Sequence, residues 1–522
     1  MPVVASQFLI MKRARTLSVL IALALLSGCP GKPGVATAAD TTLSHGGTAP
    51  VAIYGLLTDK LTKLQPNHLE YSEGIFLQYP VSVDLDAFKS GLTVTPPTAV
   101  SVAFPFVNLS NMKPRPFIPR AGGPTIFLRA LPGQTYRIEQ PAFGLALNVT
   151  TSPLSIDKIP EPIRHVTNSP YYYGILDHPF GGFLGGLVYG KFTKKISDAQ
   201  QLQVDDARRT VRAIADSGAG FVRMDFCGDQ SIGHLTPYPA ARFERYDAIV
   251  EELAAVHVTV LPEILQNCAP LYLVNSDGRT YATPENYATW AAAVAEHLKR
   301  FPQITRVELF NEPNLRGGWR PGLTSPYAGR GNGDVLAPFM KAAYAAVKAA
   351  NPSLMVVSGA FAAGGNHVDP RVVLDKAYEA GCRTGVCWDE ISVHNYRWSS
   401  PVIATIASDQ HDDNRFDIYK DLQEIALNHG DVKPKIMLTE WGYSTCEKQT
   451  QCFNPLVQAL YVAQGLNLAL ADPTIDGIVY VNIHTPVRAI PNFWDETGLL
   501  ESDYSTKPAF TIFQKFAKGS HS

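Results

Sequence analysis

From about residue 171 onward, short apolar runs alternate with longer segments whose apolar residues recur at helical spacing. The apolar runs are continuous, which is typical of parallel strands buried on both faces. The pattern predicts a strand between Tyr171 and Tyr189, and further strands at Phe221–Asp225, Val258–Leu265, Arg306–Asn311, Leu354–Gly359, Glu390–Tyr396, Lys435–Glu440 and Gly477–His484. It predicts helices at Val204–Ser217, Arg242–Ala255, Pro284–Arg300, Ala337–Ala350, Pro370–Ala380, Arg415–Asn428, Pro455–Ala471 and Pro508–Lys518.

Eight strands, each followed by a helix, are the order of elements in a (β/α)8 barrel. The strand ends fall near residues 225, 265, 311, 359, 396, 440 and 484, so they recur at similar intervals. An open, doubly wound sheet is the alternative, but no Gly-x-Gly-x-x-Gly motif follows the first strand. We therefore expect an α/β protein in which residues 171–522 form a TIM barrel.

The pattern differs before the barrel, where short strand-like runs are broken by proline and glycine. No long segment of helical spacing interrupts them, so residues 49–165 are predicted to form a small β-sandwich domain. The runs Phe88–Pro97 and Leu131–Tyr136 resemble bacterial Ig-like domains. The expected strands include Gly74–Tyr79, Leu92–Thr95, Thr125–Leu128 and Thr135–Ile138.

The first residues have the features of an export signal. Lys12, Arg13 and Arg15 precede the apolar run Leu17–Leu26, which is too short to span a membrane. The following Ser27-Gly28-Cys29 resembles a bacterial lipoprotein signal, in which the peptide is cut before the cysteine and the cysteine is lipidated; an ordinary secretory signal is the alternative. We expect residues 1–28 to be the signal peptide, residues 29–48 a flexible tether, and the protein to be exported and lipid-anchored at Cys29 on the periplasmic or cell-surface side of the bacterial envelope.

The other six cysteines form an even number, as disulfides in an oxidising compartment require. Close spacing favours two pairs and leaves a third, so we expect the bonds Cys382–Cys387, Cys446–Cys452 and Cys227–Cys268. No cysteine or histidine cluster has the spacing of a zinc finger.

The composition narrows the function. Hydrophobic residues make up 46% and charged residues 18% of the chain, which excludes wholesale disorder. The 45 basic and 47 acidic residues leave no basic excess to favour nucleic acid or an anionic membrane face. The membrane is thus expected as a partner only through the N-terminal lipid.

Two carboxylates stand where chemistry is expected in a TIM barrel, at the carboxyl ends of strands. The fourth predicted strand runs into Asn311-Glu312-Pro313, and the seventh runs into Glu440-Trp441-Gly442. Either motif alone is compatible with an ordinary loop. Together, at the ends of strands that lie three apart, they predict that Glu312 and Glu440 face each other across the mouth of the barrel.

Residues 171–518 resemble clan A of the retaining glycoside hydrolases, which includes families 5 and 39. The matching parts are the two glutamate motifs, Val222-Arg223, His394-Asn395-Tyr396, Gly498-Leu499-Leu500 and Lys507-Pro508-Ala509-Phe510. The resemblance implies that Glu312 is the general acid/base, that Glu440 is the nucleophile, and that Asn311 bonds the sugar 2-hydroxyl. It implies that Tyr396, Arg223 and His394 position and ionise Glu440.

The chemistry requires the same residue types. Cleavage of a glycosidic bond with retention needs one protonated and one ionised carboxyl, roughly 5–5.5 Å apart. Arg223 and the Tyr396 hydroxyl can stabilise the charge of Glu440, and burial beside that charge is expected to raise the pKa of Glu312. No metal and no other cofactor is needed.

Aromatic residues collect in the loops on the same side of the predicted barrel, as is typical of a cleft for a polysaccharide or oligosaccharide. We expect substrate contacts from Trp319, Trp398, Trp441 and Trp494, and about half of a wider set that adds Phe226, Tyr327 and Tyr443 to touch the sugar.

Two positions depart from the family 5 pattern and favour family 39 or a relative. The eighth strand reads Tyr480-Val481-Asn482-Ile483-His484, without the tryptophan usual in family 5, and the third ends near Glu263 instead of a histidine. The sequence thus predicts a retaining β-glycosidase. A transglycosylase that uses the same residues and a non-catalytic surface carbohydrate-binding protein are the alternatives.

Overall fold

The computed structural model describes the chain in blocks. In the N-terminal part these are residues 52–57, 60–63, 68–69, 74–78, 91–97, 100–103, 125–129 and 133–151. In the remainder they are residues 153–166, 169–177, 184–187, 197–226, 240–265, 283–314, 333–362, 368–396, 416–445, 453–485 and 495–519.

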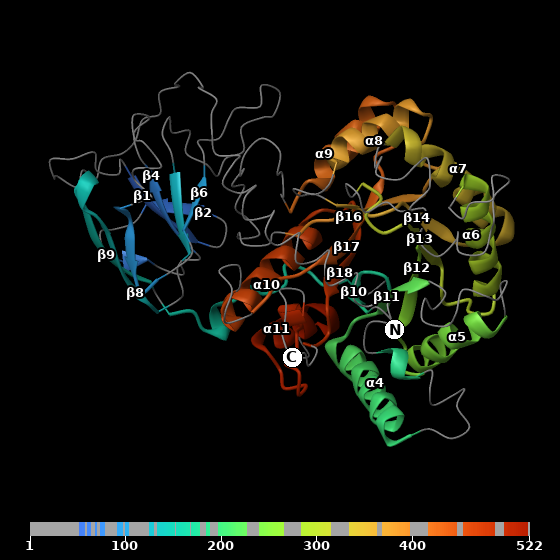
Figure 1. Cartoon of the computed structure of the whole chain (residues 1–522), viewed down its shortest axis with the longest axis horizontal. Coiled ribbons are helices and arrows are strands. Elements are labelled where there is room, and N and C mark those ends of the chain that lie inside the picture. Colours follow the sequence, from blue (N-terminus) through green and yellow to red (C-terminus); the bar gives the residue numbers. More distant parts are fainter. Residues whose placement is uncertain are drawn as a thin grey trace, which may run out of the picture.

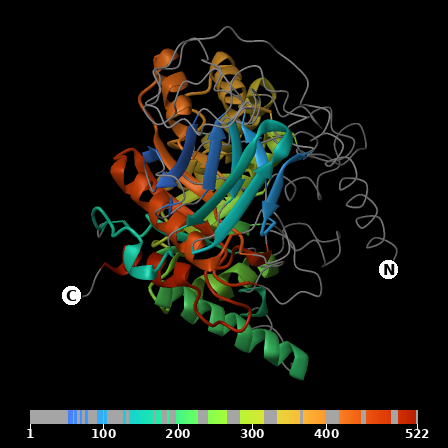
Figure 2. The ribbon, with the colours of Figure 1, turned by 90° about the vertical axis from the view of Figure 1, so that its left-hand side faces the viewer.

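The N-terminal blocks form two small β-sheets, which lie together on one side of the molecule (Figures 1 and 2). The first sheet is antiparallel and has the order β2-β1-β4-β7-β6, from β1 (Ala52–Leu57), β2 (Lys60–Lys63), β4 (Gly74–Gln78), β6 (Val100–Ala103) and β7 (Thr125–Arg129). The second has the order β3-β9-β8-β5, from β3 (His68–Leu69), β5 (Thr93–Thr95), β8 (Thr135–Gln140) and β9 (Leu145–Thr151). Its pairs are antiparallel except for β3 with β9. The four strands expected here are confirmed as β4, β5, β7 and β8.

Side chains alternate between buried and exposed along β8 and β9. Tyr136 and Ile138 of β8 and Leu147 and Val149 of β9 are buried. Because successive side chains of a strand point to opposite faces, one face of this sheet is covered by another part of the chain. The packing of the two sheets into a sandwich stays a prediction.

The segment after β9 is fastened to the outside of the barrel. It contains the short helix η2 (Ile156–Lys158) and then runs along α10 (Pro455–Ala471). The Asn467 side chain accepts a hydrogen bond from the Ile163 N–H and donates one to the Glu161 carbonyl, both at 2.9 Å. Arg164 Nε donates to the carbonyl of Leu470 at 2.7 Å.

The remainder of the chain forms a closed parallel barrel (Figure 1), as predicted. Each barrel strand pairs in parallel with its neighbours, and the first pairs with the last, which closes the sheet. A two-residue strand, β15 (Phe361–Ala362), continues the fifth strand along β16. In chain order the strands are β10 (Tyr173–Leu176), β11 (Phe221–Phe226), β12 (Thr259–Ile264), β13 (Arg306–Leu309), β14 (Met355–Val357), β16 (Glu390–His394), β17 (Lys435–Trp441) and β18 (Ile475–Val481). All eight expected strands are confirmed, and their apolar residues are buried except for the partly buried Met355 of β14, as continuous apolar runs predict.

Helices surround these strands on the outside (Figure 1). They are α4 (Asp198–Ser217), α5 (Ala240–Ala254), α6 (Pro284–Leu298), α7 (Gly333–Ala350), α8 (Pro370–Glu379), α9 (Tyr419–Asn428), α10 and α11 (Pro508–Lys518), with short helices η3 (Leu184–Gly186) and η5 (Asp495–Thr497). Another short helix, η1 (Pro141–Phe143), connects β8 and β9 in the N-terminal part. Helix α4 begins six residues before the expected Val204, because Ser197 and Gln200 form a capping box ahead of the apolar pattern.

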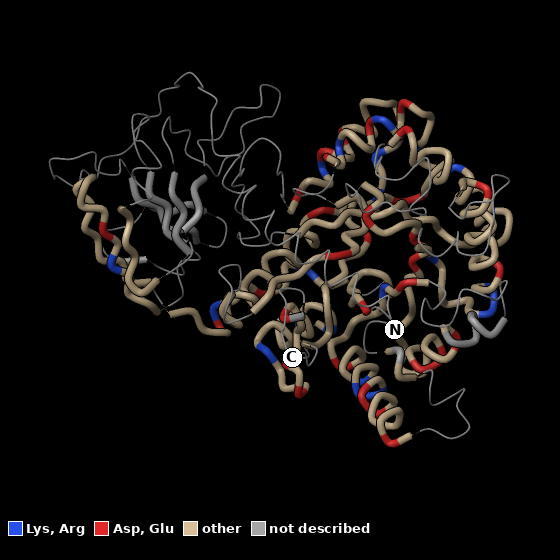
Figure 3. Tube along the Cα trace, viewed as in Figure 1, with Lys and Arg blue, Asp and Glu red and all other residues tan. Residues whose placement is uncertain are grey.

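Acidic and basic residues are interspersed over these outer helices (Figure 3), in agreement with the small net charge. Within the described residues, every helix is too short or too polar to cross a membrane. The expected disulfide Cys382–Cys387 is confirmed and lies just after α8.

A buried arginine fills the amino-terminal end of the barrel. Arg306, the first residue of β13, binds Asp476 at 2.6 Å and Glu390 at 3.2 Å, and its guanidinium lies over the ring of Tyr171. Burial raises the pKa of Glu390 to about 8, because loss of water outweighs the attraction of Arg306 and Asp476 adds a second negative charge. Glu390 therefore carries a proton at neutral pH.

This proton makes stability depend on pH. In the unfolded chain Glu390 loses its proton at about pH 4.3, the ordinary glutamate value, whereas the folded chain holds it to about pH 8. Between these values the folded state binds more protons, so stability falls as pH rises, by at most about 1.4 kcal/mol per pH unit. Glu390→Gln removes this fall. The gap, taken as the unfolding free energy of the variant minus that of the wild type, should therefore increase from about pH 5 to pH 8 in urea titrations. The exposed Glu424→Gln serves as the control, and a gap that stays constant with pH would contradict the assignment.

Candidate active site

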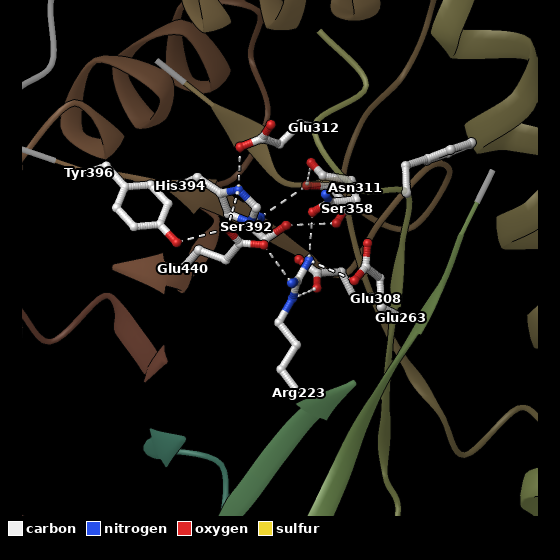
Figure 4. Close-up of polar contacts among 12 residues, drawn as sticks. Arg223, Glu263, Glu308, Asn311, Glu312, Ser358, Ser392, His394, Tyr396 and Glu440 are labelled. Carbon is white, nitrogen blue, oxygen red and sulfur yellow. Dashed lines mark hydrogen bonds and ion pairs between the residues drawn. The ribbon is translucent and has the colours of Figure 1, made fainter. Parts of the chain in front are cut away.

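Polar side chains from five strands converge at the other, carboxyl end of the barrel (Figure 4). The centre of the group is Arg223 of β11, whose side chain is completely buried. Around it lie carboxylates from three other strands: Glu263 of β12, Glu308 of β13 and Glu440 of β17. His394, the last residue of β16, completes the group together with Asn311 and Glu312 after β13 and Tyr396 after β16.

Each edge of the Arg223 guanidinium has a partner. Nη1 donates to Glu440 Oε1 at 2.9 Å, and Nε donates to Glu308 Oε2 at 2.5 Å. Nη2 donates to Asn311 Oδ1 at 3.2 Å and lies 3.1 Å from Glu263 Oε2. Burial alone would lower the pKa of Arg223, but the three carboxylates override it and hold the pKa well above its ordinary value. The positive charge beneath Glu440 is thus permanent.

The second oxygen of Glu440 also accepts a hydrogen bond. The Tyr396 hydroxyl donates to Oε2 at 3.0 Å. Burial, and then the negative charge of Glu440, raise the pKa of Tyr396 well above its ordinary value, so the phenol keeps the proton that it donates. Glu440 is therefore held at one oxygen by a cation and at the other by a neutral donor.

His394 connects the two glutamates. Its ring is buried, and Nδ1 lies 3.0 Å from Glu312 Oε1 and 3.5 Å from Glu440 Oε2. One ligand atom from each of these three residues lies within 4.8 Å of the others. The two carboxylates therefore approach each other closely, on either side of one imidazole nitrogen.

The same three residues, Glu312, His394 and Glu440, could hold a metal ion on spacing alone. The Arg223 guanidinium, bound to the neighbouring oxygen of Glu440, opposes a second cation at this place, because like charges repel. The described contacts among these residues are explained by hydrogen bonds and the arginine.

The backbone that carries Glu312 has an unusual conformation. Phe310 and Glu312 have φ angles of 55° and 42°, in the left-handed region that residues with a side chain rarely adopt. The turn lies directly against Gly359, where an added Cβ would sit 2.9 Å from Phe310 Cβ and 3.0 Å from Pro313 Cγ. Only glycine at position 359 leaves room for this turn.

Asn314 holds the far side of the same turn. Its buried side chain donates to the carbonyls of Ala362 and Val368, both at 2.7 Å, and accepts from the Ala362 N–H at 3.1 Å. These bonds join the loop after β13 to β15 and to the segment that leads into α8. Asn314 thus helps to hold Glu312 in its strained backbone conformation.

Six of the residues predicted for the site come together in the structure: Arg223, Asn311, Glu312, His394, Tyr396 and Glu440. The prediction that Trp441 contacts substrate is wrong, because its side chain is completely buried. The ring packs edge-on against Phe416 and Tyr480 and lies against Gly465 of α10, where an added Cβ would meet it at 2.2 Å. Phe226 and Tyr443, from the wider aromatic set, are buried as well.

Several other predictions concern residues outside the described part of the chain. They are the aromatic contacts Trp319, Tyr327, Trp398 and Trp494, the lipidation site Cys29, and the disulfides Cys227–Cys268 and Cys446–Cys452.

Sequence reasoning missed Glu308 as a partner of Arg223 and treated Glu263 only as a departure from a family pattern. The available signal was a charged residue in the middle of a buried strand, which needs a partner inside the barrel. Burial raises the pKa of Glu263 well above its ordinary value; Arg223 opposes this shift, and the charges of Asp225 and Glu308 add to it. Burial in the barrel therefore favours the neutral form of Glu263.

No protein-family model matches the chain, and no curated protein matches it. Solved structures match at low similarity. One is a family 39 glycoside hydrolase from the gut symbiont Bacteroides cellulosilyticus WH2, with 17% identity, a TM-score of 0.47, and coverage of 76% of this chain and 73% of that one. Another is a GH5_18 protein from Streptomyces cattleya in complex with GlcNAc, with 15% identity, a TM-score of 0.47, and coverage of 70% and 82%. A third is a GH39 beta-xylosidase from Caulobacter crescentus, with 16% identity, a TM-score of 0.44, and coverage of 69% and 72%.

The role of Asn314 predicts a large loss of stability on truncation. Asn314→Ala removes three buried hydrogen bonds and leaves their backbone partners unsatisfied, so the free energy of unfolding should fall by roughly 2–4 kcal/mol in urea titrations. Asn428→Ala, at the exposed end of α9, is the control and should change it by less than about 0.5 kcal/mol. Equal effects of the two variants would show that the Asn314 bonds do not hold the turn.

Proposed function

We propose that the protein is a retaining glycoside hydrolase that cleaves β-glycosidic bonds in a polysaccharide or oligosaccharide. The observation that supports this best is the pairing of Glu312 and Glu440 at the mouth of the barrel, with carboxylate oxygens within 4.8 Å of each other. Retaining enzymes need two carboxyl groups at about this separation, since one must reach the leaving oxygen and the other the anomeric carbon of the same sugar.

The surroundings of the two glutamates support different roles. Glu440 accepts hydrogen bonds from Arg223 at one oxygen and from Tyr396 at the other, which orients it as a nucleophile requires. The side chain of Glu312 is 22% exposed, against 11% for Glu440. Glu312 is thus the better placed of the two to meet a leaving group and later a water molecule that arrive from solvent.

The reaction proceeds in two balanced steps. In the first, a Glu440 oxygen attacks the anomeric carbon while Glu312 gives its proton to the departing glycosidic oxygen, so a glycosyl ester forms and an alcohol leaves. In the second, Glu312 takes a proton from water, the hydroxyl oxygen bonds to the anomeric carbon, and Glu440 leaves as a carboxylate. Both steps invert the anomeric carbon, and the overall result is retention.

The neighbouring side chains assist these steps. We assign Asn311, whose oxygen accepts from Arg223, to the sugar 2-hydroxyl, and His394 to the alignment of the two carboxyls. Trp319, Trp398 and Trp494 are proposed as apolar platforms for further sugar units. The substrate would be defined by these platforms, since the carboxylates act on any sugar that is held between them.

We further propose that the barrel of residues 171–522 follows a small β-sandwich of residues 49–165, and that the mature protein begins at a lipidated Cys29. The covered face of β8 and β9 supports the sandwich, because an exposed apolar face would be unfavourable in water. The basic and apolar residues before Cys29 support export to the cell envelope.

The catalytic assignment predicts distinct losses of activity. Glu440→Ala should abolish hydrolysis, with a loss of at least roughly 10⁴-fold, and Glu312→Gln should lower it by roughly 10²–10⁴-fold. For an aryl glycoside whose leaving group is a strongly acidic phenol, Glu312→Gln should slow the first step much less. Such a phenol departs as its anion and needs no proton from Glu312. Glu424→Gln, a matched exposed change, should have no effect.

The measurement is a panel of polysaccharides and aryl glycosides with mass-spectrometric analysis of products. Sugar-to-sugar products in place of hydrolysis products would identify a transglycosylase. Full activity in both glutamate variants would overturn the assignment, and binding of glycans without turnover by the wild type would identify a carbohydrate-binding protein.

The anchor is tested separately. Expressed from the complete reading frame in a Gram-negative host, the wild type should appear in the membrane fraction, with a mature mass that fits an acylated residue 29. Cys29→Ala should move the protein to the soluble periplasmic fraction or leave it uncut. A wild type that is soluble and begins at another residue would favour an ordinary secretory signal.

A further inference from the structure

Arg223 has more carboxylate partners than its work on the nucleophile requires. Besides Glu440 at Nη1, the guanidinium contacts Glu308 at Nε and Glu263 at Nη2, and both of these side chains are completely buried. Buried carboxylates are costly unless their charge is compensated. Their presence under the site therefore calls for an electrostatic explanation.

The two extra carboxylates differ in charge. Burial, together with the negative charges of Asp225 and Glu308, raises the pKa of Glu263 and so favours its neutral form, although Arg223 opposes the shift. Glu308 makes the shortest contact with the guanidinium: its Oε2 accepts a charge-assisted hydrogen bond from Nε at 2.5 Å. Glu308 and Glu440 thus share the guanidinium through hydrogen bonds from Nε and Nη1, while Glu263, 3.1 Å from Nη2, is the carboxyl whose neutral form burial favours.

We propose that Glu308 is a positioning residue for the nucleophile: it holds the Nε edge of Arg223 and shares the guanidinium charge, so that Glu440 stays basic enough to attack. If Arg223 served Glu440 alone, the full positive charge would stabilise the carboxylate in this poorly screened interior and make it a weaker nucleophile. With Glu308 in place, Arg223 orients the Glu440 carboxylate without removing its nucleophilicity. This inference rests on the proposed function.

Other titratable groups face the same cluster from the surrounding elements. They are Asp225 of β11, Glu263 of β12, Glu312 after β13, His394 and Tyr396 at the end of β16, and Tyr287 of α6, whose pKa is raised chiefly by burial. Removal of Glu308 alone could let Glu263 ionise in its place. The test therefore removes Glu308 in a background in which Glu263 has already become glutamine.

The first measurement is the pH dependence of kcat/KM, whose acid limb reports the ionisation of the free enzyme's nucleophile. Glu263→Gln replaces one neutral group with another and should leave the midpoint of the acid limb within about 0.3 pH unit of the wild type. The double variant Glu263→Gln with Glu308→Gln should move it to lower pH by roughly one unit and lower the plateau rate. A merely structural role for Glu308 would reduce activity or stability without moving the limb.

The second measurement needs no activity. If folded Glu263 retains a proton that the unfolded chain releases, the stability of the wild type falls as pH rises. The gap, taken as the unfolding free energy of Glu263→Gln minus that of the wild type, should then increase from about pH 5 to pH 7.5. A gap that stays constant would mean that Glu263 is ionised and shares the charge as well, which would overturn the assignment to Glu308.

The outcomes separate the inference from the proposed function. If Glu440→Ala abolishes hydrolysis but the double variant keeps the acid limb of Glu263→Gln, the inference is wrong and the function stands. If the wild type hydrolyses no glycoside, the function fails and the role given to Glu308 falls with it, whereas the unfolding measurement still identifies the protonated carboxylate.

Discussion

The geometry of the site depends on one buried guanidinium. Arg223 projects from β11 and binds side chains from β12, β13 and β17, so a single planar group sets the relative positions of residues on four strands. An arginine taken out of water is stable only when its charge and its five donors are satisfied. The carboxylates that satisfy it include Glu440, and the placement of this glutamate is therefore a consequence of how the barrel neutralises its own interior charge.

The two ends of the barrel use the same solution, separated by an apolar layer. Arg306 with Glu390 and Asp476 fills the amino-terminal end, and Arg223 with its partners fills the carboxyl end. Between them lies a buried apolar cluster that includes Leu176, Phe221, Leu261, Val357, Met437 and Val479. This layer excludes water from both sides, so each charged group acts in a medium that screens it weakly. This weak screening makes the Arg306 cluster at the amino-terminal end sensitive to pH. It also strengthens the interaction of Arg223 with Glu440 at the carboxyl end.

Much of this arrangement could be predicted from the sequence, for a physical reason. Continuous apolar runs reveal buried parallel strands, and parallel strands bring their carboxyl ends to one edge of the sheet. Glu312 and Glu440 could therefore be placed together from the sequence alone. The burial of Trp441 could not be predicted, because the space for its ring is left by Gly465, which lies on α10, a helix that follows later in the chain. The bonds of Asn314 and the turn at Glu312 likewise depend on Gly359 and Ala362, whose proximity arises only when the fifth strand has been laid beside the fourth.

The closure of the barrel has a consequence for biogenesis. β10 finds one of its two partners in β18, about three hundred residues later, and β18 is the last strand to leave the ribosome or a translocation pore. Until then, β10 and the most recently added strand each present an unpaired edge, which is a template for association with other chains. The polar cluster at the carboxyl end cannot form piecemeal, since Arg223 is synthesised long before Glu440. A chain interrupted before β18 would expose sheet edges, and an interruption before Glu440 would also leave Arg223 without one of its counter-ions; such chains should be substrates for proteolysis.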